Sequence, residues 1–362
     1  MKTSVTPVAP DSGTVDPSAM KLLVISNMWP GPRKPYFGVF VETRVQGYVE
    51  AGVDVTVMAN RDPRRGPLWG LLKYTGLLLR SVWSVLRRRP DVVEGHYLVP
   101  TAVITAITAK IGRCPYVLYA HGSDLAPPRA IGGFVARAVA GAAEIHTNSE
   151  DSRARLEARF PGQRAEVIPV GVDLARFPVG SPKRDPIVAF VGNLDSVKGP
   201  DVLLRALGLL RRTNWTCRIA GIGPLRDDLI ALANSLNIAD RIDWLGAVAP
   251  ERVGVFYRDA RVTVVPSRRD ALGQVAIEAL ASGTPVVVSG VGGLRSIPTA
   301  DCGSVVPPDD PLTLSVAIEQ WLEQPFGPPT VAAARKRAAG YDAAKLAEQA
   351  TDRLRVIAKR GA

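Results

Sequence analysis

Short apolar runs that alternate with helical patterns, in two successive series, constrain the fold of this chain more than any other feature. Each run is rich in β-branched or aromatic residues and ends in glycine or polar residues, which is typical of a buried strand. Helical patterns such as DVLLRALGLLRR (residues 201–212) lie between the runs. This alternation predicts parallel sheets with helices on both faces. The runs are residues 21–29, 53–59, 91–96, 115–124 and 143–149 in the first series, and 187–193, 216–221, 242–246, 262–267 and 285–290 in the second.

The pattern restarts after residue 175, beyond a segment rich in turn residues and charge, FPVGSPKRDP. The sequence therefore predicts two doubly wound, Rossmann-like α/β domains, 20–175 and 176–341. Residues 1–19 lack the apolar core of a signal peptide and are predicted to be a disordered leader. A last helix, 342–362, is predicted to pack back on the first domain. We expect the two domains to face each other across a cleft that holds a small molecule.

The charge of the chain indicates an anionic partner. Its 362 residues include 45 Lys and Arg against 34 Asp and Glu, a formal net charge of +11. Nucleic acid is not expected, because zinc-finger spacing, an aromatic RNA-binding signature and a basic tail are all absent from the sequence. Three widely spaced cysteines favour the reducing cytoplasm. No Cys–His cluster has metal-site spacing, and no apolar run in the sequence is long enough to span a membrane.

Two loops of the second domain have the composition of ligand-binding turns. In VGNLDSVKG, Gly192 and Asn193 follow the first strand, and Lys198 precedes a helix. The amino end of that helix offers unpaired N–H groups to a phosphate, which the lysine can also reach. In GIGPLRDDL, Gly221 and Gly223 form a tight turn where backbone can approach a ligand, although the dinucleotide motif G-x-G-x-x-G is absent. The alternative for Lys198 is a surface lysine near a turn.

The stretch SRRDALGQVAIEAL places two acids beside the start of a helix. Gly273 and the first turn from Gln274 are a natural seat for a diphosphate. Glu278, about one turn into the helix, can accept hydrogen bonds from a ribose diol, and Asp270 can accept them from hydroxyls on the other side of the phosphate. The alternative is structural. In it, Glu278 pairs with an arginine, and Asp270 balances the two arginines that precede it.

Taken in order, these motifs resemble the retaining, nucleotide-sugar-dependent glycosyltransferases of family 4, which have the two-domain GT-B fold. The resemblance covers about residues 20–355. Asp270 and Glu278 have the seven intervening residues of the family's acidic pair, and ALASGTPVV follows them. The other landmarks are VGNLDSVKG, GIGPLRDDL, VIPVGVDLARF, VVPS and CGSVVPPDDP. The resemblance implies transfer of a sugar from a nucleoside diphosphate to an acceptor hydroxyl, with retention of the anomeric configuration.

The resemblance also implies roles for single residues. Glu278 would hold the ribose hydroxyls, and Asp270 would hold hydroxyls of the transferred sugar. Lys198 would neutralise the diphosphate, and His121 would approach the transferred sugar. The implied catalytic residues are therefore His121, Lys198 and Asp270, with Asp124 on the acceptor side. The implied donor-binding residues are Gly38, Gly192, Asn193, Lys198, Gly221, Gly223, Leu245, Gly273, Gln274 and Glu278, and the backbone near Leu245 would hold the nucleobase.

Three departures from the family pattern bear on the diphosphate and the sugar. Asn193 stands where the family usually has arginine, so Lys198 would carry more of the diphosphate charge. Asp270 stands where glutamate is usual and is one methylene shorter. Arg295 and Ser296 replace the usual proline and glutamate after the paired glycines, which makes Arg295 a candidate for the missing cation.

We expect neither a metal nor another cofactor to be required if Lys198 and the helix N–H groups suffice, and the lack of a D-x-D triplet in the chain fits this expectation. Lys198 and helix N–H groups would stabilise the charge on the leaving diphosphate. No carboxylate nucleophile is evident, so the leaving phosphate would take the acceptor proton on the same face. His121 has the alternative of a hydrogen-bonded structural residue, and His96 and His146 are predicted to be structural.

A basic segment with tryptophans bears on the acceptor. Residues 64–89 carry seven basic residues and no acid, with leucines and Trp69 and Trp83 among the rest. A helix of this kind can lie in an anionic membrane interface on the inner face of the cell membrane. That location suits a lipid-linked acceptor in envelope polysaccharide or glycolipid synthesis, and a glycan is the alternative acceptor. The alternative is a core helix on the first sheet with arginines along its exposed face.

Two other classes of function stay open on the sequence. A nucleotide-sugar epimerase of the same fold would turn over the donor without an acceptor, but a set of acid–base residues for it is not evident. A non-catalytic scaffold that binds a nucleotide sugar is compatible with the departures at Asn193 and Asp270. Turnover with and without acceptor separates the three classes.

Overall fold

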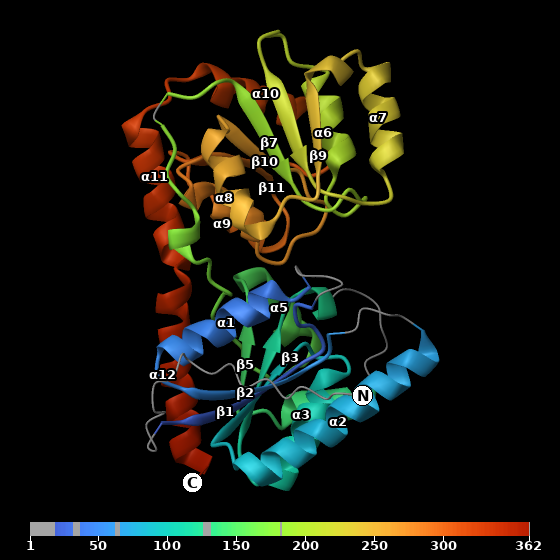
Figure 1. The fold of residues 1–362 in the computed structure, drawn as a ribbon, viewed down its shortest axis with the longest axis vertical. Coiled ribbons are helices and arrows are strands. Elements are labelled where there is room, and N and C mark those ends of the chain that lie inside the picture. The colour runs from blue at the N-terminus through green and yellow to red at the C-terminus, as the bar shows by residue number, and fades with distance from the viewer. Residues whose placement is uncertain (1–18, 32–36, 62–65, 126–131, 182, 362) are drawn as a thin grey trace. The chain divides into compact units, whose positions relative to one another are not determined.

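The computed structural model describes residues 19–31, 37–61, 66–125, 132–181 and 183–361, which form two compact units (Figure 1). Unit 1 comprises the described residues up to Gly171 together with the helix α12 (Ala343–Gly361), and unit 2 comprises Val172–Asp342. The sequence predicted these two divisions at 175/176 and 341/342, whereas the structure has them after Gly171 and after Asp342. The predicted leader lies outside the described residues, apart from its last position.

The described residues of unit 1 form one sheet of six parallel strands, in the order β2-β1-β3-β4-β5-β6. The strands are β1 (Lys21–Ser26), β2 (Asp54–Ala59), β3 (Val92–His96), β4 (Tyr116–Ala120), β5 (Glu144–Thr147) and β6 (Glu166–Val167). The helices are α1 (Val39–Glu50), α2 (Pro67–Arg88), α3 (Thr101–Gly112), α4 (Gly133–Ala140), α5 (Glu150–Arg159) and α12, with a short 3₁₀ turn η1 (Ser123–Leu125).

Helices pack on both faces of this sheet because successive side chains of a strand point to opposite sides. On one face, Leu22 and Val24 of β1 pack with the helices α1 and α12. On the other face, Leu23 and Ile25 pack with α2 and α3. Burial on both faces explains why the strand is a continuous apolar run, which the sequence shows.

Unit 2 repeats this architecture with the strand order β12-β11-β10-β7-β8-β9, again all parallel. Its strands are β7 (Ile187–Val191), β8 (Thr216–Ala220), β9 (Ile242–Gly246), β10 (Val262–Val265), β11 (Val286–Ser289) and β12 (Gly303–Val306). Its helices are α6 (Pro200–Leu207), α7 (Arg226–Ser235), α8 (Pro250–Asp259), α9 (Gln274–Ala281), α10 (Pro311–Glu323) and α11 (Pro328–Ala338), with 3₁₀ turns η2 (Leu174–Arg176), η3 (Ala239–Arg241), η4 (Gly292–Ser296) and η5 (Ala339–Tyr341).

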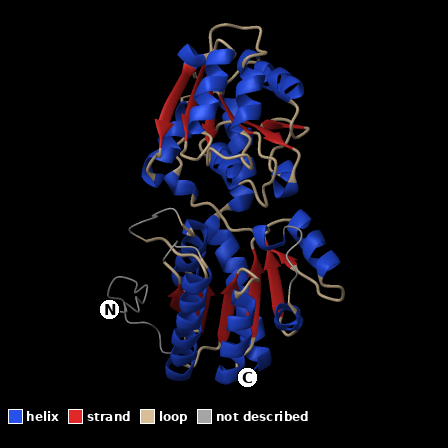
Figure 2. Ribbon diagram, turned by 90° about the vertical axis from the view of Figure 1, so that its right-hand side faces the viewer, coloured by secondary structure: helices blue, strands red, loops and turns tan. Residues whose placement is uncertain are grey.

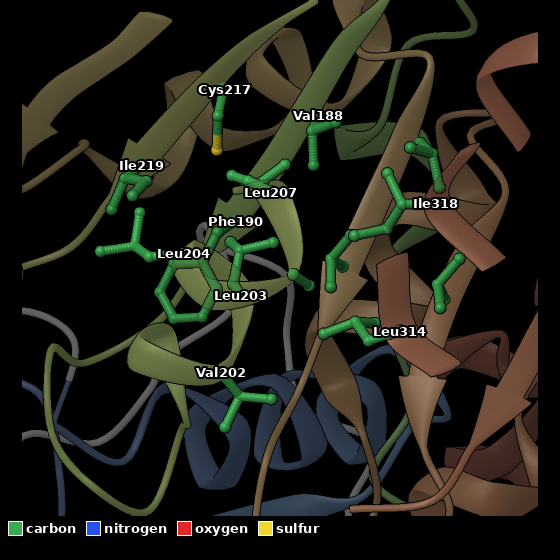
Figure 3. Packing of buried hydrophobic residues seen from close by; sticks show 14 of the residues in the cluster. Val188, Phe190, Val202, Leu203, Leu204, Leu207, Cys217, Ile219, Leu314 and Ile318 are labelled. Carbon is green, nitrogen blue, oxygen red and sulfur yellow. The ribbon is translucent and has the colours of Figure 1, made fainter. Parts of the chain in front are cut away.

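Helices, blue in Figure 2, pack against the strands of unit 2, which are red. The helices α6, α7 and α10 share one apolar cluster with the sheet, and α8, α9 and α11 share the other. Figure 3 shows the first cluster, where Leu203 and Leu207 of α6 pack with Val188 and Phe190 of β7. The sheet is thus covered by helices on both faces, so side chains that bind a ligand are expected on the loops at the strand ends.

Two predicted elements end earlier than their patterns suggested. The helix predicted over 201–212 ends at Leu207, because Leu209 and Leu210 already bond three residues back rather than four. The first strand, predicted to reach residue 29, ends at Ser26, whose hydroxyl bonds both the carbonyl and the N–H of Met28 and turns the chain. The strands β6 and β12 were not predicted from the apolar pattern.

Each sheet has one point where the order of strands along the chain reverses direction. In unit 1 this point lies between β1 and β3, and in unit 2 it lies between β7 and β10. Ligands of doubly wound sheets bind beyond the carboxyl ends of the strands at such a point. In unit 2 the loops that follow β7 and β10 at this point are Gly192–Gly199 and Pro266–Gly273. The sequence predicted ligand binding by the same two loops.

Candidate active site

Lys198 and Asp270 meet at the switch point of unit 2. Nζ of Lys198 lies 2.7 Å from Oδ2 of Asp270. The other carboxylate oxygen, Oδ1, accepts hydrogen bonds from the N–H of Gly273 at 2.8 Å and from that of Leu272 at 3.3 Å. Asp270 thus fixes the start of α9 with one oxygen and holds the lysine with the other. The predicted alternative, in which Asp270 balances the two arginines before it, is wrong.

Arg268 has its own partners and anchors this loop. It bonds both carboxylate oxygens of Asp201 at 2.7 and 2.9 Å, and Asp309 at 2.5 Å. It also donates to the carbonyl of Ser196 at 2.8 Å. A planar guanidinium suits this bidentate pairing. The loop before α9 is therefore tied to the start of α6, and this connection holds Lys198 beside Asp270.

The amino end of α9 has the geometry of an anion seat. Gly273 precedes the helix with φ +88°, a left-handed conformation that favours glycine. Among the described residues, nothing accepts a hydrogen bond from the N–H of Gln274 or of Val275. Unpaired N–H groups and the helix dipole attract a phosphate to such a position. Lys198 supplies a full positive charge at the same helix start.

Glu278 lies one turn further along α9, where its partner is a tyrosine. The hydroxyl of Tyr257, a fully buried residue of α8, donates to Oε2 of Glu278 at 3.0 Å. Burial raises the pKa of Glu278 to about 7, although this hydrogen bond and the charge of Arg176 act in the opposite direction. The alternative in which Glu278 pairs with an arginine is therefore wrong, because its hydrogen-bond partner is Tyr257. The carboxyl changes ionisation near neutral pH.

Gly192, Gly221 and Gly223 bring two strand-end loops into backbone contact. A Cβ atom on Gly221 would lie 1.8 Å from the carbonyl oxygen of Gly192, and one on Gly223 would lie 2.3 Å from that of Leu194. The N–H of Gly221 also donates to the carbonyl of Gly246 at 2.7 Å. Gly221 and Gly223 are therefore required by the approach of one loop to another, whereas the sequence had suggested the approach of a ligand.

Two other predicted donor-binding residues of unit 2 are exposed at the same edge of the sheet. Asn193 follows Gly192 and is exposed. Leu245, near the end of β9, is 47% exposed beside the backbone that Gly221 contacts. Arg295, the candidate for a missing cation, is exposed on the turn η4.

The remaining predicted residues, Gly38, His121 and Asp124, lie together in unit 1. Gly38 precedes α1, and the ring of Phe40 in that helix lies 4.8 Å from the ring of His121. Asp124 accepts a hydrogen bond from the N–H of Leu98 at 2.9 Å, and burial raises its pKa to about 6. His121 follows β4 and is 6% exposed.

Sequence reasoning missed two side chains that bear directly on these residues. Tyr257 precedes Glu278 by 21 residues, and no motif links them. His96, which was predicted to be structural, lies 2.9 Å from His121. A signal for the second contact existed, because both histidines stand at the ends of consecutive predicted strands, which are often neighbours.

Comparison with known proteins decides the family. The model of glycosyl transferases group 1 matches residues 172–341, and the model of glycosyltransferase family 4 matches residues 38–176. A D-inositol 3-phosphate glycosyltransferase from Frankia alni is 30% identical over 76% of this chain and 76% of its own length. The chain belongs to glycosyltransferase family 4. It is a nucleotide-sugar-dependent glycosyltransferase.

Further relatives agree with this assignment. A putative teichuronic acid biosynthesis glycosyltransferase, TuaC of Bacillus subtilis, is 26% identical to this glycosyltransferase over 86% of the chain and 92% of its own length. The crystal structure of Anabaena HepE in complex with UDP has a TM-score of 0.74 at 19% identity, and covers 93% of this chain and 100% of its own. That likeness confirms the predicted GT-B fold, and the cleft between the domains stays a prediction.

Proposed function

We propose that this glycosyltransferase binds the diphosphate of a nucleotide sugar at the amino end of α9 and transfers the sugar with retention. The observation that carries the proposal is the meeting of Lys198, Asp270 and two unpaired N–H groups at the switch point of unit 2. Glu278, one turn further, is placed for the ribose hydroxyls, which donate to a carboxylate. The acceptor is proposed to be lipid-linked, in envelope polysaccharide or glycolipid synthesis.

In the proposed reaction, the bond from the anomeric carbon to the diphosphate breaks and a bond to the acceptor oxygen forms on the same face. The acceptor proton passes to the leaving diphosphate oxygen. Lys198 and the N–H groups of Gln274 and Val275 stabilise the negative charge that develops there. No metal or other cofactor is part of the proposal.

Donor binding changes the partner of Lys198 in this scheme. When the diphosphate takes Nζ of Lys198, Oδ2 of Asp270 loses its cation and can accept a hydroxyl of the transferred sugar. Oδ1 keeps its hydrogen bond to Gly273, so α9 stays in place. A side chain as short as aspartate reaches both partners because the loop itself is anchored by Arg268.

A panel of nucleotides tests the donor site. UDP, GDP, ADP and their common sugar conjugates are titrated by calorimetry, beginning with UDP because HepE was solved with it. One nucleotide should bind, and Glu278→Ala should weaken it roughly tenfold to a hundredfold, as loss of hydrogen bonds to a charged group does. Glu251→Ala, an exposed acid of α8, is the control. If no nucleotide binds, the proposal fails. Turnover of donor without acceptor would favour an epimerase.

The ionisation of Glu278 predicts a pH dependence. Hydroxyl donors favour the carboxylate, so binding below the pKa of about 7 must first remove a proton. We expect affinity for the nucleotide sugar to fall by up to about tenfold between pH 8 and pH 6, with proton release on binding. The sugar conjugate is used because a free terminal phosphate titrates in this range. Glu278→Gln should remove the dependence, and an unchanged pH profile would contradict this role.

We also propose that α2 binds an anionic membrane surface. Its inner face packs on the sheet through Leu77 and Val85, as the core-helix alternative predicted. Its outer face, however, is largely apolar, whereas the core-helix alternative predicted arginines along it. The large apolar side chains of α2 that are between 54% and 67% exposed are Leu68, Leu71, Leu72, Leu79, Trp83 and Leu86.

A row of cations borders this apolar face. Lys73, Arg80 and Arg87 are spaced by seven residues, which is close to two helical turns and places them on one side. The guanidinium of Arg87 lies 5.4 Å from the ring centre of Trp83. Apolar side chains with adjacent cations suit hydrocarbon and phosphate headgroups together. Residues 64 and 65 lie outside the described residues, and no helix that the structure describes is long and apolar enough to cross a membrane.

Vesicle co-sedimentation tests this surface. The protein should bind anionic vesicles at low salt, and the triple variant with Lys73, Arg80 and Arg87 changed to glutamine should bind about a hundredfold more weakly, at about 1 kcal/mol per charge. The control removes three exposed charges elsewhere, with Arg226, Lys336 and Lys359 changed to glutamine. Equal loss in both variants, or no binding by the wild type, would remove the membrane proposal.

A further inference from the structure

A buried polar cluster in unit 1 contains all three histidines of the chain, and His121 stands at its edge. His96 ends β3, and His121 follows β4, the neighbouring strand. Nδ1 of His96 lies 2.9 Å from Nε2 of His121, and the two residues are 0% and 6% exposed. Burial lowers the pKa of both rings well below its usual value, and the charge of Arg44 adds to this. Both rings are therefore neutral.

Two neutral imidazoles can share this hydrogen bond in only one direction at a time, since each carries one N–H and one lone pair. Glu94 decides the direction. Its Oε1 lies 3.8 Å from Nε2 of His96, and it is held by the hydroxyl of Tyr48 at 3.1 Å and by Arg44 at 3.4 Å. Among the described residues, Nε2 of His96 makes no hydrogen bond that would oppose the electrostatic effect of Glu94.

A carboxylate at this distance favours an N–H over a lone pair on the facing nitrogen. His96 therefore carries its proton on Nε2, and its Nδ1 is an acceptor. It follows that His121 donates from Nε2 to His96. The proton of His121 is thus placed on the nitrogen that faces the interior.

His146 also has an acid at its Nε2, and its hydrogen-bond partners fix which ring nitrogen carries the proton. Arg44 can only donate, and it lies 3.2 Å from Nδ1 of His146, which must accept. Nε2 of His146 therefore carries the proton and donates to Glu144 at 2.7 Å. Burial opposes the ionisation of Glu144, but hydrogen bonds from His146 and Arg353 outweigh it and lower its pKa to about 2. An ionised acid at Nε2 thus sets the tautomer of a histidine in this cluster.

Aromatic rings fix the orientation of His121. The ring centres of Tyr97 and Tyr119 each lie 4.5 Å from that of His121, and Phe40 lies at 4.8 Å. Tyr97 has a left-handed backbone, φ +72°, which a bulky residue rarely adopts. Within the part of the chain that the structure describes, Nδ1 of His121 makes no hydrogen bond to protein. With the proton on Nε2, this nitrogen presents a lone pair.

We propose that His96 and Glu94 are positioning residues that fix His121 as its Nε2–H tautomer, so that Nδ1 accepts a hydrogen bond from a hydroxyl of the transferred sugar. The substrate part of this inference rests on the proposed function. The opposite tautomer would present an N–H and would prefer an oxygen without a hydrogen. The tautomer therefore selects a hydroxyl-bearing sugar over an analogue in which that hydroxyl is methylated or removed.

Nitrogen NMR of protein labelled only in its histidines tests the tautomer directly. With three histidines the spectrum has only six ring nitrogens, and His121 is assigned by comparison with His121→Gln. The wild type should show a protonated Nε2 and an unprotonated Nδ1 for His121. A protonated Nδ1 in the wild type overturns the inference, whatever the activity of the protein.

Two substitutions of His96 then separate positioning from simple packing. His96→Asn keeps an acceptor oxygen near the place of Nδ1, and His96→Phe keeps the ring shape without an acceptor. His96→Phe should give a mixture of His121 tautomers and weaken nucleotide-sugar binding about tenfold, with binding of the nucleoside diphosphate alone unchanged. His96→Asn should restore both. Equal sugar binding in wild type and His96→Phe contradicts the inference.

The outcomes distinguish this inference from the function on which it rests. If nucleotide sugars bind but His121 is protonated on Nδ1, the inference fails and the proposed function stands. If no nucleotide binds, the proposed function fails, and the substrate part of the inference fails with it. If His96→Phe does not fold, the wild-type spectrum and the comparison with His96→Asn still decide the tautomer.

Discussion

The Lys198→Ala variant is expected to lose a factor of roughly 10² to 10³ in kcat, the usual cost of removing one group that stabilises the charge of a transition state. Lys198 is the cation at the start of α9, and Asn193 cannot replace it because an amide carries no charge. The assay uses the donor found by titration and a lipid-linked acceptor. The loss should appear in kcat more than in donor affinity, because the charge on the leaving group develops during bond breaking.

The stability of the Lys198→Ala variant should change little. The lysine side chain is 29% exposed, and partly exposed ion pairs contribute about 1 kcal/mol or less. Asp270 keeps its hydrogen bond to Gly273, so the helix start is retained. Lys336→Ala, an exposed lysine of α11, is the matched control and should leave both kcat and Tm unchanged. Full turnover by Lys198→Ala would remove the lysine from the proposed mechanism.

The Gly221→Ala variant is expected to lose at least about 3 kcal/mol of unfolding free energy, since it forces a backbone clash. The new Cβ atom would lie 1.8 Å from the carbonyl oxygen of Gly192, and no side-chain rotation can relieve a contact between two backbones. The loop that carries Lys198 would have to move, so nucleotide binding should fall with stability. Chemical denaturation and the nucleotide titration measure the two effects.

Gly246→Ala is the control that separates the clash from backbone conformation. Gly246 accepts the hydrogen bond of Gly221, has φ +65°, and has no atom within 4 Å of an added Cβ. Its substitution should cost only about 1 kcal/mol, the cost of a left-handed backbone for alanine. Equal destabilisation by both substitutions would show that the approach of Gly221 to Gly192 is not tight in solution.

The sequence predicted the second sheet and its binding edge because both follow from local patterns. Apolar runs that end in glycine mark strand ends, and the carboxyl ends of parallel strands share one edge. Lys198 and Asp270 are 72 residues apart, but they follow β7 and β10, which are neighbours at the switch point. The topology therefore brings the two loops together, and the family motif indicates the same two side chains.

The partners of these side chains did not follow from the sequence, because they depend on packing between elements. The contact between Tyr257 and Glu278 requires that α8 and α9 pack side by side, with these two residues at the same level along the helices. The contact between His96 and His121 requires the pairing of His96 with Tyr119 across two strands. The alternative in which Asp270 balances Arg268 was wrong, because Asp201 of α6 and Asp309, which precedes α10, hold this arginine. Periodicity sets which face a residue occupies, and it leaves such cross-element partners open.

The return of α12 to unit 1 has a consequence for synthesis on the ribosome. Leu354 and Ile357 of α12 complete the apolar cluster that begins with Val41 and Val45 of α1. The chain makes α12 only after all of unit 2, so unit 2 can fold as a whole while the α1 face of unit 1 still lacks its cover. Domains generally fold in order from the amino terminus. Here the amino-terminal unit is finished last, and a nascent chain must keep that apolar face from aggregating until α12 emerges.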